Sequence, residues 1–238
     1  FRLKDRSVYE KWYGLVHSAP ELLDKSTYGL YEFTDYSSLN SELIANPGCY
    51  PTSVLLGLIP LMRKFHSGIV SVSAISYSGT SGAGKTPKAN LMFSEMFGNT
   101  QAYNVNKHRH QPEIYQELNR AGYNGPFSFT PHLLPVSAGI YTTISVHMKD
   151  VVNQEEIDGL YETAYSSRKF VRMRKTAPEL KWVTGTNFCD INVNVSGKVI
   201  IVTSCIDNLI KGAAGQAMQN LNGLFGFDES MGILPLNN

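Results

Sequence analysis

Cysteine is scarce in this sequence, because its 238 residues contain only Cys49, Cys189 and Cys205. An odd number of cysteines at unrelated spacings fits neither a disulfide framework nor a zinc site. We therefore expect no metal site, at least one free thiol, and a reducing compartment, the cytoplasm.

Charge of one sign and long apolar runs are also lacking. There are 21 basic and 20 acidic residues, giving a net charge of +1, so no basic field favours nucleic acid or an anionic membrane. The longest apolar runs, such as residues 54–62, are far shorter than the roughly 20 residues of a membrane-spanning helix. We expect a small-molecule partner and neither nucleic acid nor membrane.

What the chain does contain is typical of a packed globule. Hydrophobic residues make up 42%, and this length is enough for one large domain or two small ones. Glycine (20) and proline (11) are too few for a low-complexity or collagen-like chain. The first residue is Phe1 rather than Met, within a charged stretch, so we expect a piece of a longer protein.

Hydrophobic periodicity and turn residues predict helices mainly in the first half and strands mainly in the second. The expected helices span residues 7–14, 38–44, 53–65, 88–97, 111–121, 153–166 and 207–221, the first capped by Ser7 and the last by Asp207. The expected strands span residues 28–33, 69–77, 127–130, 139–149, 170–174, 191–195 and 198–205. Because strands and helices do not alternate regularly, the sequence predicts an α+β fold.

A glycine-rich loop follows the expected strand 69–77. Residues 79–86 (GTSGAGKT) match the phosphate-binding pattern G-x-x-x-x-G-K-[ST], in which backbone amides cradle phosphates and a lysine reaches the terminal one. Pro87 and the serines of the preceding strand argue against this interpretation, because such strands are nearly all apolar. A nucleotide-binding loop and a glycine turn that lets two backbones approach closely both remain open.

Cys49 lies in a sharp turn, residues 46–52 (NPGCYPT), immediately before an apolar helix. The positive end of a helix dipole lowers the pKa of a thiol and makes it a nucleophile. The alternative is a small buried residue in a turn. Residues 107–110 (KHRH) place two histidines between cations. A thiol with a histidine elsewhere in the chain is the pattern of nucleophilic catalysis, here on an anionic and phosphorylated carbonyl compound; a solvated basic loop is the alternative.

These segments together resemble one known family. Residues 46–52 resemble the active-cysteine segment of N-acetyl-γ-glutamyl-phosphate reductases, and residues 79–85 and 108–114 resemble that family's glycine loop and histidine segment. Further blocks match in family order at residues 129–133, 185–187 and 207–216. The resemblance covers essentially the whole chain and favours the family's own glycine loop over a phosphate-binding loop. Nothing in the chain corresponds to the family's N-terminal dinucleotide-binding domain.

The resemblance implies a fold and a division of the chain. The expected fold is a glyceraldehyde-3-phosphate dehydrogenase-like C-terminal catalytic domain, with a mixed and largely antiparallel sheet and helices on one face. Residues 1–47 would be a remnant of the NADP-binding domain and its connection, residues 48–206 the catalytic and dimerisation domain, and residues 207–238 a helix and tail returning toward the nucleotide-binding domain.

The implied reaction is the NADPH-dependent reductive dephosphorylation of N-acetyl-γ-glutamyl phosphate to its semialdehyde, in arginine biosynthesis, through a cysteine thioester in a homo-oligomer. The resemblance assigns catalysis to Cys49 and His108, substrate binding to Asn46, Ser78, Gly79, Arg109 and His110, and cofactor binding to Gly82 and Asn208. Ala138 stands where the family usually has arginine, which points to a related N-acyl or carrier-linked acyl phosphate as another substrate. Two other functions remain: a phosphate-loop nucleotide-binding protein, and a non-catalytic dimerisation fragment.

Overall fold

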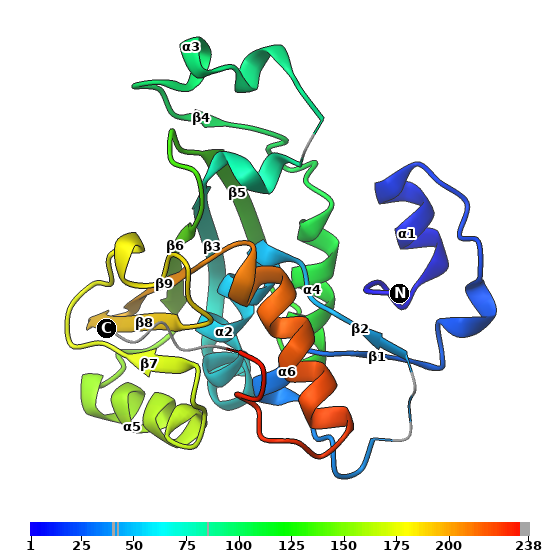
Figure 1. Cartoon of the computed structure of the whole chain (residues 1–238). Coiled ribbons are helices and arrows are strands. Elements are labelled where there is room, and N and C mark those ends of the chain that lie inside the picture. The colour runs from blue at the N-terminus through cyan, green and yellow to red at the C-terminus, as the bar shows by residue number, and fades with distance from the viewer. Residues whose placement is uncertain (40, 42, 85, 234–238) are drawn as a thin grey trace.

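A seven-stranded sheet forms the centre of the molecule in this computed structural model, which describes residues 1–39, 41, 43–84 and 86–233 (Figure 1). Its strands are β3 (Ile69–Ser78), β4 (Gln101–Ala102), β5 (Phe127–Leu133), β6 (Ile140–Met148), β7 (Val171–Met173), β8 (Cys189–Ser196) and β9 (Val199–Ile206). They lie in the order β4-β5-β3-β6-β9-β8-β7. The β3–β5 and β7–β8 pairs are parallel and the other four are antiparallel. The prediction of an α+β fold with a mixed, largely antiparallel sheet is confirmed.

The long helix α2 (Cys49–Phe65) packs against β6 and β9, with α4 (His110–Arg120) and α5 (Gln154–Tyr165) beside it on the same face of the sheet. Every α2 residue from Tyr50 to Met62 is buried, which accounts for its nearly continuous apolar sequence. A Cβ atom on Gly57 would lie only 3.0 Å from Cδ1 of Ile144. The missing side chain therefore lets the helix approach the sheet closely.

A proline lies inside α2, and the helix compensates for it. Pro60 has no N–H to donate to the carbonyl of Leu56, four residues earlier. The hydroxyl of Tyr165, on α5, donates a hydrogen bond to that carbonyl, and the hydroxyl of Tyr161 donates to the next one, Gly57. Tyr165 thus satisfies the one carbonyl that Pro60 leaves without a helical donor in the core.

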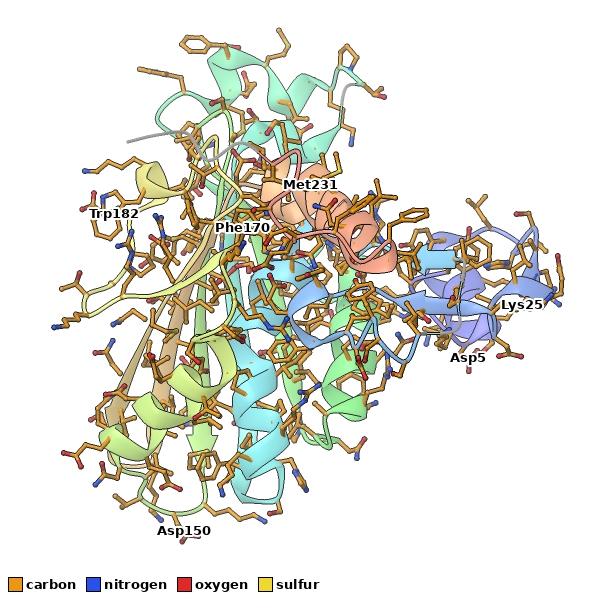
Figure 2. The ribbon with its side chains drawn as sticks, turned by 60° about the horizontal axis from the view of Figure 1, so that its bottom comes forward. Asp5, Lys25, Asp150, Phe170, Trp182 and Met231 are labelled. Atoms are coloured by element: carbon orange, nitrogen blue, oxygen red, sulfur yellow. The ribbon has the colours of Figure 1, made fainter. Side chains whose placement is uncertain are left out.

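The N-terminal segment stands out to one side of the sheet, as the labels of Asp5 and Lys25 show in Figure 2. It contains α1 (Arg6–Tyr13), strand β1 (Ser26–Tyr28), a 3-10 turn (Tyr31–Phe33) and strand β2 (Leu43–Ala45), which pairs in parallel with β1. The expected cap of α1 is wrong, because Asp5 rather than Ser7 accepts the first free amides. The expected strand 28–33 is a turn over its last three residues.

Two other expected helices differ from the structure. The expected helix 38–44 is wrong at its end, because residues 43–45 form strand β2. Residues 40 and 42 lie outside the described residues. The expected helix 88–97 is a 3-10 turn (Ala89–Leu91) and the single-turn helix α3 (Phe93–Met96). They are separated at Met92, whose backbone is extended (φ −65°, ψ 149°). Chain breaks of this kind are not visible in an apolar pattern.

The C-terminal helix begins in an unusual way. Asp207 accepts hydrogen bonds from the amides of Leu209 and Ile210, so its expected role as a cap is confirmed. The next residues form a π-turn (Ile210–Ala214), and only then does the α-helix α6 (Gly215–Leu224) begin. π-turns within helices occur frequently at functional sites.

The second face of the sheet is uncovered around β3 in the described chain, whereas Asp190, Asn192 and Cys205 of β8 and β9 are buried on that face. Along β3 the side chains of Val72 and Ala74 are buried beneath the helices, whereas Ile75, which points the other way, is 38% exposed. Ser73 forms an exposed hydrogen bond with Ser128 of the neighbouring strand on that second face. Within the described part of the chain, every helix is too short or too polar to span a bilayer.

Candidate active site

Cys49 is the first residue of α2, and Gly48 is the helix cap with an extended backbone (ψ 160°). The thiol residue lies between two segments that are far away in the sequence. On one side, a Cβ atom on Gly212 of the π-turn would lie 2.8 Å from Cβ of Cys49. On the other, a Cβ atom on Gly48 would lie 2.5 Å from Nε2 of His110. Only glycine allows these two close approaches.

A buried carboxylate supports the turn that presents the thiol. Oε1 of Glu113, on α4, accepts hydrogen bonds from the amide of Gly48 and from the hydroxyl of Tyr28, each at 2.8 Å. The guanidinium of Arg2 lies 3.9 Å from the other oxygen. Burial raises the pKa of Glu113, and Arg2 and the two donors oppose this rise.

The two histidines of the basic segment meet at this site. The rings of His108 and His110 are 4.8 Å apart, and both pack edge-on against the ring of Tyr50. Burial lowers the pKa of His108 to about 4 and holds that of His110 well below its usual value. Nδ1 of His108 accepts the backbone amide of His110 at 3.2 Å, so the proton of its neutral ring lies on Nε2. Both rings are neutral at pH 7.

The expected low pKa of the Cys49 thiol is not found. Burial raises the pKa of Cys49 to about 11, and the nearby carboxylate of Glu113 raises it further, while the amide of Tyr50 lowers it. A helix N-terminus favours a charge by about 1 kcal/mol, or less than one pKa unit. Burial can shift a pKa by 3 to 5 units, so burial outweighs the helix terminus.

The glycine loop does not have the structure of a nucleotide-binding loop. The amides of Gly79, Thr80 and Ser81 donate hydrogen bonds of 2.9–3.1 Å to carbonyls of residues 136–139. Amides that are already bonded cannot cradle phosphates. The loop continues as a 3-10 turn (Thr80–Ala83) rather than as an α-helix, and Lys85 lies outside the described residues. The interpretation as a close approach of two backbones is confirmed, since a Cβ atom on Gly79 would lie 2.7 Å from the nitrogen of Ala138.

The structure brings three other predicted residues together at this loop. A Cβ atom on Gly82 would lie 2.7 Å from Oγ of Ser78 and 3.4 Å from Nδ2 of Asn208. The side chain of Asn208 accepts the amide of Gly139 at 2.7 Å and donates to Ser81 at 3.0 Å. Asn208 follows Asp207, whose carbonyl accepts the amide of Gly212. The loop is thus linked to the π-turn that packs on Cys49.

Two predicted substrate residues have other partners. The side chain of Asn46 donates to the carbonyl of Ala213 at 3.1 Å and accepts from Asn220 at 2.8 Å. The exposed Arg109 places its guanidinium over the ring of Tyr13. Asn46 therefore holds the π-turn against the turn that contains Cys49, and the assignment of both residues to substrate stays a prediction.

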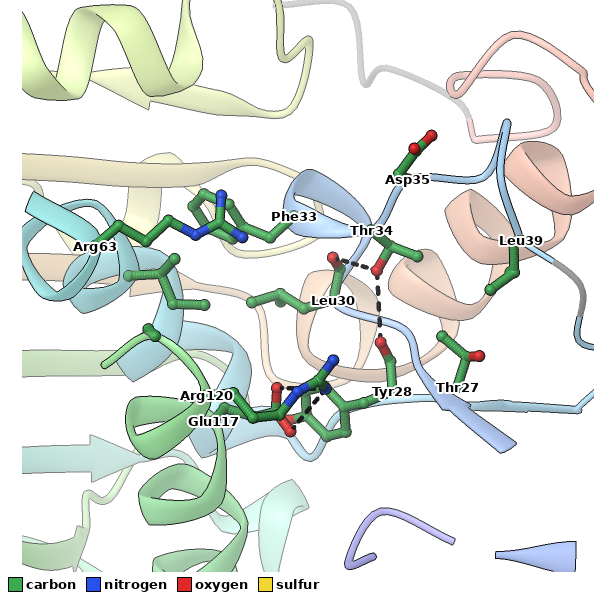
Figure 3. A pocket seen from close by; sticks show the side chains of 12 residues that line it. Thr27, Tyr28, Leu30, Phe33, Thr34, Asp35, Leu39, Arg63, Glu117 and Arg120 are labelled. Atoms are coloured by element: carbon green, nitrogen blue, oxygen red, sulfur yellow. Dashed lines mark hydrogen bonds and ion pairs between the residues drawn. The ribbon is translucent and has the colours of Figure 1, made fainter. Parts of the chain in front are cut away.

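Sequence reasoning missed Glu113 and Arg2 at this site. Glu113 is part of the histidine segment, and its distance of three residues from His110 places both on one side of α4; this spacing was an available signal. Arg2 has no such signal, because its contact joins residues more than 100 positions apart. A separate hollow of about 220 Å³ (Figure 3) is lined by Leu30, Phe33, Arg63, Glu117, Arg120 and their neighbours, and by none of the predicted site residues.

The chain matches known proteins along almost its whole length. Residues 49–208 match the family model described as semialdehyde dehydrogenase, dimerisation domain. The chain is 44% identical to the N-acetyl-γ-glutamyl-phosphate reductase of Dehalococcoides mccartyi (strain CBDB1), over 98% of this chain and 69% of that protein. It is 45% identical to the reductase of the same name from Listeria innocua, over 99% of this chain and 70% of that protein. The chain belongs to the N-acetyl-γ-glutamyl-phosphate reductase family.

Solved structures show the same fold at low identity. Aspartate semialdehyde dehydrogenase II of Vibrio cholerae, in complex with ASA, superposes with a TM-score of 0.66 at 17% identity, over 93% of this chain and 77% of that one. A probable aspartate-semialdehyde dehydrogenase of Pseudomonas aeruginosa superposes with a TM-score of 0.67 at 15% identity, over 89% and 70%. The fold is therefore that of semialdehyde dehydrogenases, and the reductase-family chain is an oxidoreductase enzyme.

Proposed function

We propose that this chain catalyses the NADPH-dependent reductive dephosphorylation of N-acetyl-γ-glutamyl phosphate to N-acetylglutamate semialdehyde, a step of arginine biosynthesis, through a thioester on Cys49. The observation that carries the proposal is the place of Cys49 at the start of a buried helix, beside two neutral histidines and a buried carboxylate. The reductase relatives support the substrate and the reaction.

The chemistry begins with the removal of a proton from the thiol. Because the pKa of Cys49 is raised to about 11, a base must accept this proton at neutral pH, and a neutral imidazole can do so. The thiolate then attacks the carbonyl carbon of the acyl phosphate. The bond between the carbonyl carbon and the bridging phosphate oxygen breaks and phosphate leaves. The acyl group remains on Sγ of Cys49 as a thioester.

We assign the acid/base role to His108 and a positioning role to His110. In this role His108 takes up the thiol proton at the start of the cycle and gives the same proton back as the aldehyde forms. The ring must then release the amide of His110 from Nδ1, because one ring nitrogen has to be free to accept the proton. His110 packs on Gly48 and is nearly fully buried, which suits a residue that fixes the turn. Glu113 holds the same turn through the amide of Gly48.

NADPH, when bound, supplies the hydride that reduces the thioester to the semialdehyde. We propose Gly82 and Asn208 as the residues of this chain that contact it. The amides of Gly79, Thr80 and Ser81 are bonded to carbonyls, so Gly82 would offer NADPH its backbone and Asn208 its side chain. Ser78 and Gly79 beside them, together with Asn46, Arg109 and His110, remain the proposed substrate contacts.

We also propose that the chain acts as a homo-oligomer in the cytoplasm. The uncovered face of the sheet, with Ile75 at its centre, is the surface that a second copy would cover, and the matching family model is described as a dimerisation domain. A reducing compartment suits an enzyme that needs a free thiol, and all three cysteines are free in this structure.

The acylation step tests the proposal without the reduction step. Incubation with N-acetyl-γ-glutamyl phosphate should release phosphate and leave an N-acetylglutamyl adduct on the peptide that contains Cys49, detected by mass spectrometry. When the dinucleotide-binding domain of the family is also supplied, NADPH should discharge the adduct with loss of absorbance at 340 nm. Cys205→Ser is the matched control and should still form the adduct, whereas Cys49→Ser should not. A folded chain that forms no adduct on Cys49 contradicts the proposal.

A further inference from the structure

A lysine is completely buried next to the candidate active site. The side chains of Lys211, in the π-turn, and of Glu32, in the 3-10 turn Tyr31–Phe33, are both 0% exposed and form an ion pair. Nζ of Lys211 also donates to Oε1 of Gln219 at 2.6 Å. Buried lysines are rare without such partners, and the proposed reaction gives this one no part.

The pair joins segments that are distant in the sequence. Gln219 receives a second hydrogen bond from Asn187 at 3.0 Å and donates to Glu229 at 3.1 Å. In the sequence, Glu32 comes before Cys49 and the histidine segment, whereas Lys211 and Glu229 come after both. One ion pair thus fixes the N-terminal segment, the π-turn and the C-terminal tail to one another.

The hydrogen bonds of the π-turn show what this connection holds. The amides of Gly212, Ala214 and Gly215 each donate to the carbonyl five residues earlier. An α-helix would use the carbonyl four residues earlier, so relaxing the turn changes the position of each residue in it. In this structure the π-turn keeps the side chain of Lys211 in the interior and the backbone of Gly212 against Cys49.

The two neighbours in this turn therefore face opposite partners. Lys211 reaches into the interior toward Glu32, and Gly212 packs its backbone on the thiol residue, where a Cβ atom would lie 2.8 Å from Cβ of Cys49. A shift of the Lys211 backbone moves Gly212 as well, since the two residues share a peptide bond, and the buried partners of the Lys211 side chain oppose such a shift.

We infer that the buried Lys211–Glu32 pair is a positioning device for the nucleophile, which holds the π-turn so that Gly212 closes one side of the Cys49 site. The inference rests on the proposed function only in taking Cys49 as the nucleophile. Replacing a buried ion pair by neutral side chains often leaves stability unchanged, whereas removing one partner alone does not. A positioning role can therefore be separated from a structural one.

The test is the alkylation rate of each cysteine by iodoacetamide at pH 8, in the parent chain and in the double variant Lys211→Met with Glu32→Gln. We expect the double variant to fold and Cys49 to react about tenfold faster, because loss of the Gly212 contact admits water and lowers the thiol pKa by about one unit. The pH profile of Cys49 alkylation should shift in the same direction. The charged neighbours of the thiol, Glu113 and Arg2, are the same in all variants.

Cys205 is the internal control, since it is buried and reacts only when the fold opens. Cys189 is also buried, but Lys211 and Glu32 both affect its pKa. An equal rise at Cys49 and Cys205, or a folded double variant whose Cys49 reacts as in the parent, overturns the inference. If the double variant does not fold, Lys211→Met alone removes the side chain that holds the π-turn and leaves Glu32 the donor Nε2 of Gln219 at 3.4 Å. The same selective rise is expected, and its absence has the same meaning. Alkylation needs no turnover, so failure here is distinct from failure to form the Cys49 adduct.

A matched variant breaks an ion pair elsewhere. Lys169→Met with Asp228→Asn removes an exposed pair whose Nζ and Oδ2 atoms are 2.5 Å apart. It should leave all three alkylation rates unchanged. A selective rise at Cys49 in this variant as well would show that any charge lost near the C-terminal tail has the effect, and would overturn the role of Lys211.

Discussion

Glu113 accepts the backbone amide of Gly48 at 2.8 Å, although the two residues are 65 positions apart. The contact joins the start of α4 to the turn that begins α2. It places the histidine segment beside the thiol, because His110 is three residues before Glu113 on the same helix. One buried carboxylate thus fixes the position of the turn that contains Cys49 relative to the histidine segment.

Glu113→Ala should destabilise the fold and Glu113→Gln should do so much less. Alanine leaves the amide of Gly48 and the hydroxyl of Tyr28 without an acceptor, and each buried unpaired group costs about 1 to 3 kcal/mol. Glutamine keeps an acceptor oxygen. Urea unfolding measures the difference, and Glu179→Ala, which removes an ion pair between two exposed side chains, Glu179 and Lys181, should cost within about 1 kcal/mol. Equal losses for Glu113→Ala and Glu113→Gln would contradict the role of the acceptor.

The elements that the sequence predicted well are those whose burial leaves a local pattern. In the helix 53–65 most residues are apolar and buried. In the strands around residues 69–77 and 139–149, buried residues largely alternate with more exposed ones. Strand β2 could not be predicted in this way. Its three residues are held by pairing with β1, a partner far away in sequence, and so a local helix signal was misleading.

At the site, motifs identified the residues but not their environment. The turn before α2 and the histidine segment were both predicted, and the structure places them together. The low thiol pKa was wrong because it depended on the helix terminus alone. The contact with Gly212 comes from a π-turn whose hydrogen bonds span five residues, and no composition or spacing distinguishes such a turn from an α-helix.

Alkylation of Cys49 should depend steeply on pH. The thiol pKa is raised to about 11, so the thiolate fraction, and with it the rate, should rise about tenfold per pH unit between pH 8 and 10. Cys49 should react before Cys189, whose pKa burial raises to about 12, and before the buried Cys205. A rate that levels off near pH 7 would contradict the effect of burial, and equal rates at all three in a folded chain would contradict the role of Cys49 as nucleophile.

The fold should lose stability as the pH falls from about 6.5 to about 4. His108 has its pKa lowered from 6.5 to about 4 in the folded chain, so the unfolded chain binds more protons in this window and stability rises with pH there. The contribution is about 3 kcal/mol at most. His108→Asn should reduce the slope of the profile measured by urea unfolding and leave the part due to His110, whose pKa burial also lowers. His147→Asn, exposed on the other face of the sheet, should leave the profile unchanged. The same slope in both variants would contradict this source of acid sensitivity.

A charge on the uncovered face should separate a homo-oligomer into single chains. Ile75 is 38% exposed at the centre of the sheet, and burying a glutamate between two copies without a partner is costly. Light scattering of Ile75→Glu should give the mass of one chain where the parent gives a multiple of 26.4 kDa. Val151→Glu, a change at a loop residue that is 71% exposed, should leave the mass unchanged. If the Ile75 variant keeps the parent's mass, the second copy binds elsewhere.

His108 and His110 should differ in their effects on acylation of Cys49. General acid–base residues contribute about 10²- to 10⁴-fold in rate, so His108→Ala should slow the release of phosphate from the acyl phosphate by that factor. His110→Ala opens a space against Gly48 and should act mainly through the position of the turn, with a smaller loss.

The control for the two histidines is His132→Ala, which removes a ring stacked on Tyr77 at 4.7 Å and should leave the rate nearly unchanged. Alkylation of Cys49 by iodoacetamide in each variant shows whether the thiol is still accessible. A large loss in His110→Ala with a nearly silent His108→Ala inverts the assignment, and the ring that packs on Gly48 is then the base. If neither change slows acylation, another group accepts the thiol proton, and Glu113, whose pKa burial raises, is the next residue to replace.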